Sequence, residues 1–149
     1  MVQLNGVEYG IFSSAISLAL ALCPLILVPI LTKMGEAAAA CLSAVMIGVS
    51  LLLLGITEQF YMLVVFGVMM GAFNGTQNTV MSAFMLKNIA AVNRDNYMPA
   101  YVLILQMCVV IGFLISMLVK STQFTTAFFG LGGLTVVAGV LGFWVNWQR

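Results

Sequence analysis

Residues 60–86 read FYMLVVFGVMMGAFNGTQNTVMSAFML, and this uncharged stretch decides the class of fold. A helix needs about 20 predominantly apolar residues to cross the hydrocarbon core of a bilayer, so the stretch is long enough to span a membrane. Gly67, Gly71 and Gly75 recur every four residues and therefore share one face of the helix. This small-xxx-small pattern lets a second helix approach closely. We expect the stripe to serve packing, with helix sliding near a substrate path as the alternative.

The whole chain shares this apolar character. Of its 149 residues, 63% are hydrophobic and 6% are charged, whereas a soluble domain has roughly 25% charged residues. Five Lys and Arg with four Asp and Glu are too few to cover a soluble surface. The composition therefore indicates a membrane protein in a lipid bilayer. The net charge of +1 excludes a basic field for nucleic acid.

Charged and polar clusters divide the sequence into five apolar runs, at about residues 9–31, 37–56, 60–86, 100–119 and 124–145. Short connections between long helices place neighbouring helices side by side and antiparallel. A backbone that crosses lipid must satisfy its hydrogen bonds internally, which favours helices. We therefore predict an all-α, polytopic membrane helical bundle. Its five transmembrane helices form a single transmembrane domain over residues 1–149.

Positive charges predict the orientation of the bundle, because Lys and Arg accumulate in cytoplasmic loops. One side of the predicted membrane carries Lys33, Lys87, Arg94 and Arg149. The other side carries Lys120 together with Glu8 and Glu58. We therefore expect an external N-terminus and a cytoplasmic C-terminus in a cell membrane, either the plasma membrane or the bacterial inner membrane. An odd helix number with an external N-terminus and no signal sequence points to a missing upstream segment.

Polar side chains within the apolar runs are the candidates for function. Asn74, Gln77 and Asn78 share one face of the third run. An unpaired amide in hydrocarbon costs several kcal/mol, so these side chains must meet other helices or water. They either line a substrate cavity or hold helices together through hydrogen bonds. Gln106 of the fourth run has the same two interpretations.

The sequence offers no parts for catalysis. It contains no histidine, and no acidic residue lies deep in an apolar run, so acid–base chemistry and metal binding lack their usual groups. Three cysteines at unrelated spacings do not form a redox or metal pair; they are Cys23, Cys41 and Cys108. We therefore predict a protein that is not an enzyme, without catalytic residues, metal or cofactor.

The order of these features resembles the C-terminal half of a major facilitator superfamily transporter, most of all the multidrug drug:proton antiporter branch. The resemblance rests on Lys33-Met-Gly35 after the first run, on Gly71-Ala-Phe-Asn74-Gly75-Thr-Gln77-Asn78 and on Gln106-Met107. It covers nearly the whole chain as the last five of six helices. It implies a partial major facilitator fold that moves substrate by alternating access.

The loop after the first run carries part of a family motif. The pattern G-x-x-x-D-[RK]-x-G-[RK] falls on residues 28–36, where Lys33 and Gly35 match. Thr32 and Glu36 replace the acidic and the last basic residue of the pattern, so the loop lacks two of the charges of the relay that is usual there. The resemblance also implies that the amide face of the third run borders the central cavity.

We expect a partial secondary active transporter that exports small apolar or amphiphilic compounds. Eleven methionines supply flexible surface suited to varied apolar ligands, although core filling explains them as well. Proton coupling would need an ionisable group inside the membrane, which a missing N-terminal half or a partner membrane subunit would supply. The alternatives are a membrane scaffold that docks through its glycine-rich helix and a small homo-oligomeric pore.

Overall fold

The computed structural model describes residues 5–90, 93–118 and 124–147, and helices account for nearly all of them. The elements are α1 (Gly6–Leu31), the 3-10 helix η1 (Thr32–Met34), α2 (Glu36–Ile56), α3 (Phe60–Asn88), α4 (Arg94–Leu118) and α5 (Phe124–Trp147). No strand occurs among the described residues. The predicted all-α membrane bundle is thus confirmed.

Four of the described helices are long and apolar enough to cross a membrane, namely α1, α2, α3 and α5. In α4 the described part contains a shorter apolar segment, Tyr97–Met107. The helix itself begins at Arg94, six residues before the apolar run that the sequence marks. An apolar run shows which part of a helix lies in hydrocarbon, whereas polar turns can extend the helix into the headgroup layer.

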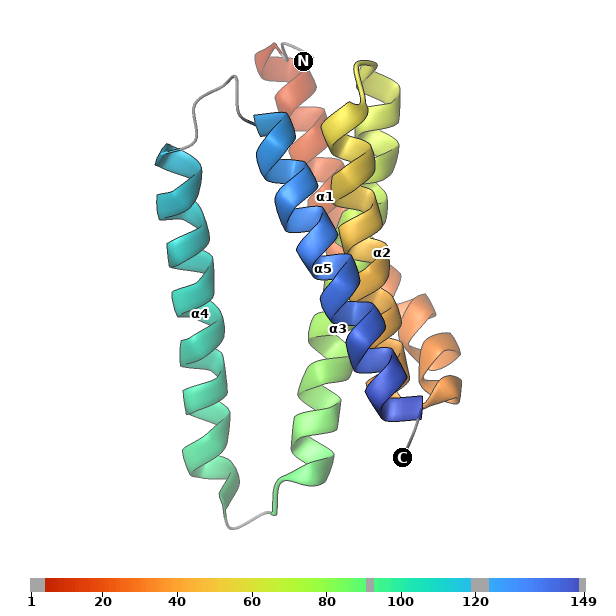
Figure 1. Ribbon diagram of the computed structural model, residues 1–149, viewed down its shortest axis with the longest axis vertical. Coiled ribbons are helices and arrows are strands. Elements are labelled where there is room, and N and C mark those ends of the chain that lie inside the picture. The colour runs from red at the N-terminus through yellow and green to blue at the C-terminus, as the bar shows by residue number, and fades with distance from the viewer. Residues whose placement is uncertain (1–4, 91–92, 119–123, 148–149) are drawn as a thin grey trace.

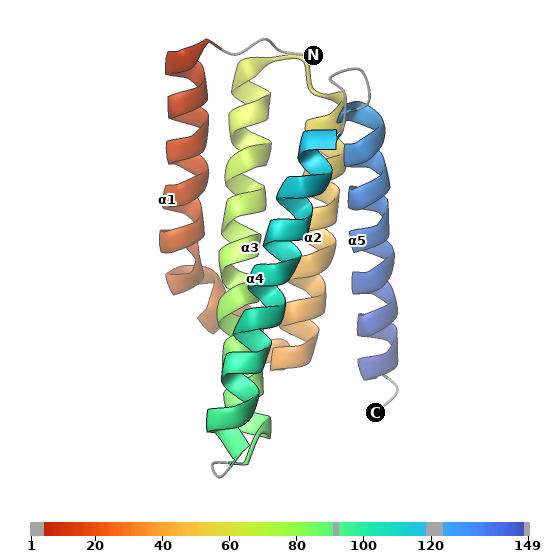
Figure 2. The same cartoon turned by 90° about the vertical axis from the view of Figure 1, so that its left-hand side faces the viewer.

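Local sequence explains how α1 begins and ends. Asn5 and Glu8 form a capping box, in which the backbone N–H of Glu8 donates to Asn5 Oδ1 at 2.8 Å. Pro24 and Pro29 lie inside the helix, and Figure 2 shows its far end bending out of line. The connection to α2 turns at Gly35, whose φ of 97° is a conformation that favours glycine.

In the part of the chain that the structure describes, three closely packed helix pairs build the bundle: α1 with α3, α3 with α2, and α2 with α5. The helices therefore follow one another in the order α1, α3, α2, α5 (Figure 2). Figure 1 shows α4 standing away from this row, and in Figure 2 it passes in front of α3 and α2. The N-terminus and the connection between α2 and α3 lie at one end of the bundle, and the C-terminus points to the other (Figure 1).

Small residues bring α2 and α5 together. A Cβ atom at Gly48 would lie 2.7 Å from the carbonyl oxygen of Gly132 and 2.8 Å from the backbone nitrogen of Val136. On α5, a Cβ atom at Gly139 would lie 3.0 Å from the carbonyl oxygen of Cys41. The two backbones are thus in direct contact, as small-xxx-small packing in membranes requires.

Candidate functional site

The glycine stripe of α3 is covered by α1 of the same chain. Gly67, Gly71 and Gly75 are all buried. A Cβ atom at Gly67 would meet side-chain atoms of Phe12 and Ile16, and one at Gly71 would lie 2.6 Å from the carbonyl oxygen of Ile16. The stripe therefore forms an interface within this chain, and the surface on which the scaffold alternative relied is occupied.

Gly75 occupies the tightest position in the stripe. A Cβ atom there would collide with the carbonyl oxygen of Leu20 and lie 2.8 Å from the Pro24 ring. In an α-helix the carbonyl of residue 20 accepts the N–H of residue 24, but proline has no N–H. The approach of the Gly75 backbone therefore covers a carbonyl that Pro24 leaves without its helical partner.

The predicted amide face lies beside this interface, on the more exposed part of α3. Asn74 and Gln77 are half-buried and Asn78 is exposed. Asn78 Nδ2 donates to Asn74 Oδ1 at 3.5 Å, within the same helix. Among the described residues, none of the three amides bonds to a side chain on another helix. In this arrangement the amides remain available to water or a ligand.

Hydroxyl groups near the amides are satisfied within α3. Thr76 is fully buried, and its Oγ1 donates to the carbonyl oxygen of Ala72 at 2.8 Å. Thr79 and Ser82 donate in the same way to carbonyl oxygens four residues earlier. Such bonds to the preceding turn satisfy a hydroxyl group within its own helix, so its burial in a membrane costs little free energy. The amides are therefore the polar groups of this face whose bonding capacity is incompletely used.

Gln106 lies on α4 and is exposed. The described residues provide no hydrogen bond between its side chain and the amides of α3. Because α4 is absent from the closely packed pairs, the structure does not bring Gln106 together with Asn74, Gln77 and Asn78.

An ion pair that the sequence pattern did not indicate lies beside the loop between α1 and α2. Lys87 Nζ lies 3.2 Å from Glu36 Oε1 and joins the end of α3 to the start of α2. Lys33 of η1 lies three residues before Glu36 and is exposed. Gly35 forms the turn between η1 and α2. A cavity of about 350 Å³ adjoins the pair, lined by Thr32, Gly35, Glu36, Ala37, Phe84, Lys87 and Asn88.

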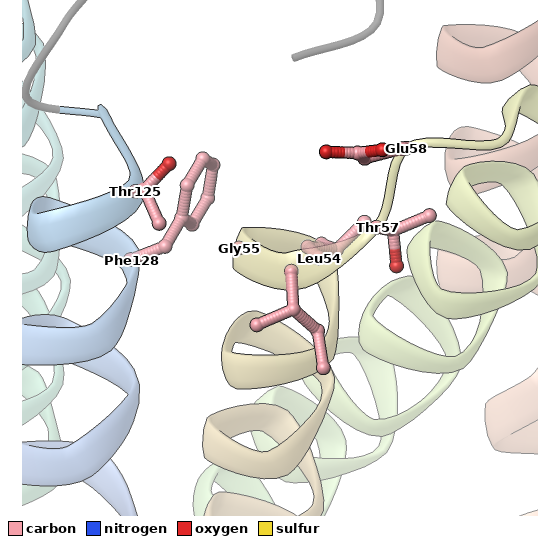
Figure 3. A pocket seen from close by; sticks show the side chains of 7 residues that line it. Leu54, Gly55, Thr57, Glu58, Thr125 and Phe128 are labelled. Carbon is pink, nitrogen blue, oxygen red and sulfur yellow. The ribbon is translucent and has the colours of Figure 1, made fainter.

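A second cavity of about 310 Å³ lies at the opposite end of the bundle (Figure 3). It is lined by Leu54, Gly55, Ile56, Thr57, Glu58, Thr125 and Phe128. Figure 3 shows the Glu58 carboxylate directed across the cavity toward the side that carries Phe128 and Thr125. Sequence patterns did not indicate this cavity, because its walls come from segments far apart in the chain.

Acidic and sulfur-bearing groups do not gather at either cavity. Within residues 5–90, 93–118 and 124–147, no three His, Cys, Asp or Glu side chains are placed to hold a metal ion. Lys120 and Arg149, which entered the orientation prediction, lie outside the described residues.

Comparison with known proteins gives one match. The family model described as Major Facilitator Superfamily matches residues 2–149. No curated protein matches the chain, and neither does any solved structure.

Proposed function

Because the chain belongs to the major facilitator superfamily of membrane transporters, we propose that it forms one wall of the substrate path in a secondary active transporter. The observation that carries this proposal is the contrast between two faces of α3. Its glycine face is sealed against α1, whereas the amides of Asn74, Gln77 and Asn78 have no partner on another described helix. Amides without partners on other helices are suited to line a water-filled path through which a substrate moves.

The same face indicates the class of substrate. Met81 follows Asn78 by one helical turn and is exposed, and a thioether adapts its shape to varied apolar groups. No charged side chain occurs in α3 between Phe60 and Leu86. A site that combines amides with methionine and lacks fixed charge fits small apolar or amphiphilic compounds. We propose that the transporter exports such compounds, in the manner of drug:proton antiporters.

Coupling to protons would require a group from outside this chain. All four acidic residues lie at helix ends or in a connection: Glu8, Glu36, Glu58 and Asp95. An ionisable residue within the membrane is the usual carrier of proton coupling. We propose that the chain acts as the C-terminal half of the fold and that an N-terminal half or partner subunit supplies this residue.

We further propose that the N-terminus lies outside the cell and the C-terminus in the cytoplasm. Lys33 lies in η1 between α1 and α2, and Lys87 and Arg94 flank the connection between α3 and α4 at the same end of the bundle (Figure 1). This accumulation of positive charge favours the cytoplasmic side.

Access of water to the amide face tests the proposal. A cysteine introduced as Asn78→Cys, in a chain without native cysteines, should react with a membrane-impermeant thiosulfonate. Thr76→Cys is the matched control, because Thr76 is fully buried two residues away. If the cysteine at position 78 reacts no faster than the cysteine at position 76 in the assembled transporter, the result contradicts an aqueous path along this face.

A further inference from the structure

The cavity bounded by Glu58 and Phe128 is separate from the proposed substrate path. Glu58 precedes α3, whereas Asn78 lies 18 residues beyond the first residue of that helix. At 1.5 Å of rise per residue this separation is about 27 Å along the helix axis. The cavity therefore lies at the mouth of the bundle, whereas the amides lie well inside it.

The polar groups of this cavity favour a positively charged ligand. The Glu58 carboxylate is exposed and forms no ion pair within the part of the chain that the structure describes. Thr57 Oγ1 donates its proton to the carbonyl oxygen of Leu53 at 2.6 Å, so toward a ligand it offers lone pairs only. A carboxylate is likewise an acceptor when ionised. Both groups can therefore bind a hydrogen-bond donor or a cation.

The apolar lining of the cavity indicates which class of cation it would bind. Phe128 lies on the wall opposite Glu58 (Figure 3), and the face of an aromatic ring attracts a cation through its quadrupole. Leu54 and Ile56 add aliphatic surface. A divalent metal ion needs several oxygen ligands, whereas the cavity contains a single carboxylate. An alkyl-substituted ammonium group is suited to all three parts of the lining: its charge to the carboxylate and the aromatic ring, and its alkyl groups to the aliphatic wall.

We propose that this cavity is a binding site for small organic ammonium cations at the mouth of the bundle. Its volume of about 310 Å³ lies at the lower end of the roughly 300–1,000 Å³ typical of ligand pockets. The site does not depend on the proposed function of the amide face. A cation bound there lies at the mouth of the bundle whether or not it is transported.

Choline is a suitable probe, because it carries a trimethylammonium group and dissolves in water. Binding is measured by saturation-transfer NMR on the full chain in a maltoside detergent, which contains no choline. The parent chain should show saturable binding. Its neutral carbon analogue, 3,3-dimethylbutan-1-ol, should bind at least tenfold more weakly, because it keeps the shape and lacks the charge.

Two variants assign the binding to this cavity. Glu58→Gln should weaken choline binding about tenfold or more, since it removes the charged acceptor. Phe128→Leu should weaken it by roughly two- to thirtyfold, since it removes the ring and keeps an apolar wall. Glu8→Gln is the matched control, because Glu8 is an acid at the same end of the bundle and glutamine also supports a capping box (Figure 1). It should leave the dissociation constant within twofold.

The result that would overturn the proposal is equally specific. Absence of saturable choline binding by the parent chain contradicts it, as does equal binding of the neutral analogue. Unchanged binding by Glu58→Gln also contradicts it; because Glu58 is exposed in a connection, that variant should fold normally. Helical content measured by circular dichroism verifies that each variant is folded.

Discussion

Gly75 of α3 lies against the carbonyl oxygen of Leu20 of α1, the carbonyl that Pro24 cannot engage. The close approach of the Gly75 backbone takes the place of the missing helical bond. The proline and the glycine therefore form a matched pair across the interface. Together they permit a bend in α1 without leaving a polar group exposed to hydrocarbon.

Substitution of this glycine should destabilise the bundle more than substitution elsewhere in the stripe. We expect Gly75→Ala to lower stability by about 1–3 kcal/mol, because its Cβ would collide with backbone. Gly67→Ala should cost less, since its Cβ would meet side-chain atoms that can move. Thermal unfolding in detergent measures the difference. If the Gly75→Ala variant is as stable as the Gly67→Ala variant, the contact between Gly75 and the backbone of α1 is not tight.

The α2 and α5 interface allows a comparison of glycines on the same pair of helices. Gly48→Ala should separate the helices, because its Cβ would lie 2.7 Å from the Gly132 carbonyl oxygen. Gly133→Ala is the control, since a Cβ there meets nothing within 4 Å. We expect the melting temperature to fall for the first variant and to stay within error for the second. A similar loss in both would contradict the observed packing.

Much of this architecture could be predicted from the sequence, because charges interrupt apolar runs at each membrane surface. The spacing of Gly67, Gly71 and Gly75 indicated a tight interface but could not identify α1 as the partner. The pairing of Glu36 with Lys87 spans 51 positions and depends on how α2 and α3 align. The Glu58 cavity likewise requires the start of α5 to lie beside the end of α2. Such long-range proximity has no periodic signature.

The Glu36–Lys87 pair should contribute little to stability. The Lys87 side chain is 72% exposed, and exposed pairs are typically worth about 0–1 kcal/mol. A double-mutant cycle with Glu36→Gln and Lys87→Gln should give a coupling energy in this range, and salt should reduce it. A coupling energy well above 1 kcal/mol would indicate that the pair is more buried in the membrane than the structure shows.

The orientation can be tested at both ends of the bundle. Cysteines introduced as Glu58→Cys and Lys120→Cys should react with an impermeant reagent added outside intact cells. Arg149→Cys should react only after the cells are opened, because positive charge favours the cytoplasm. The native Cys23, Cys41 and Cys108 are first replaced by alanine. External labelling of position 149 would reverse the proposed topology.

The central claim is that the amide face of α3 lines the substrate path, and transport per folded molecule tests it most directly. Export of a lipophilic dye is measured in cells that provide the complete transporter, and each rate is divided by the amount of folded chain. We predict that Gln77→Ala and Asn78→Ala alter this normalised rate at nearly unchanged abundance. If the amides join helices, each substitution should instead cost about 0.6–2 kcal/mol of stability. Transport would then fall only with abundance, and an unchanged normalised rate for both variants would contradict the claim.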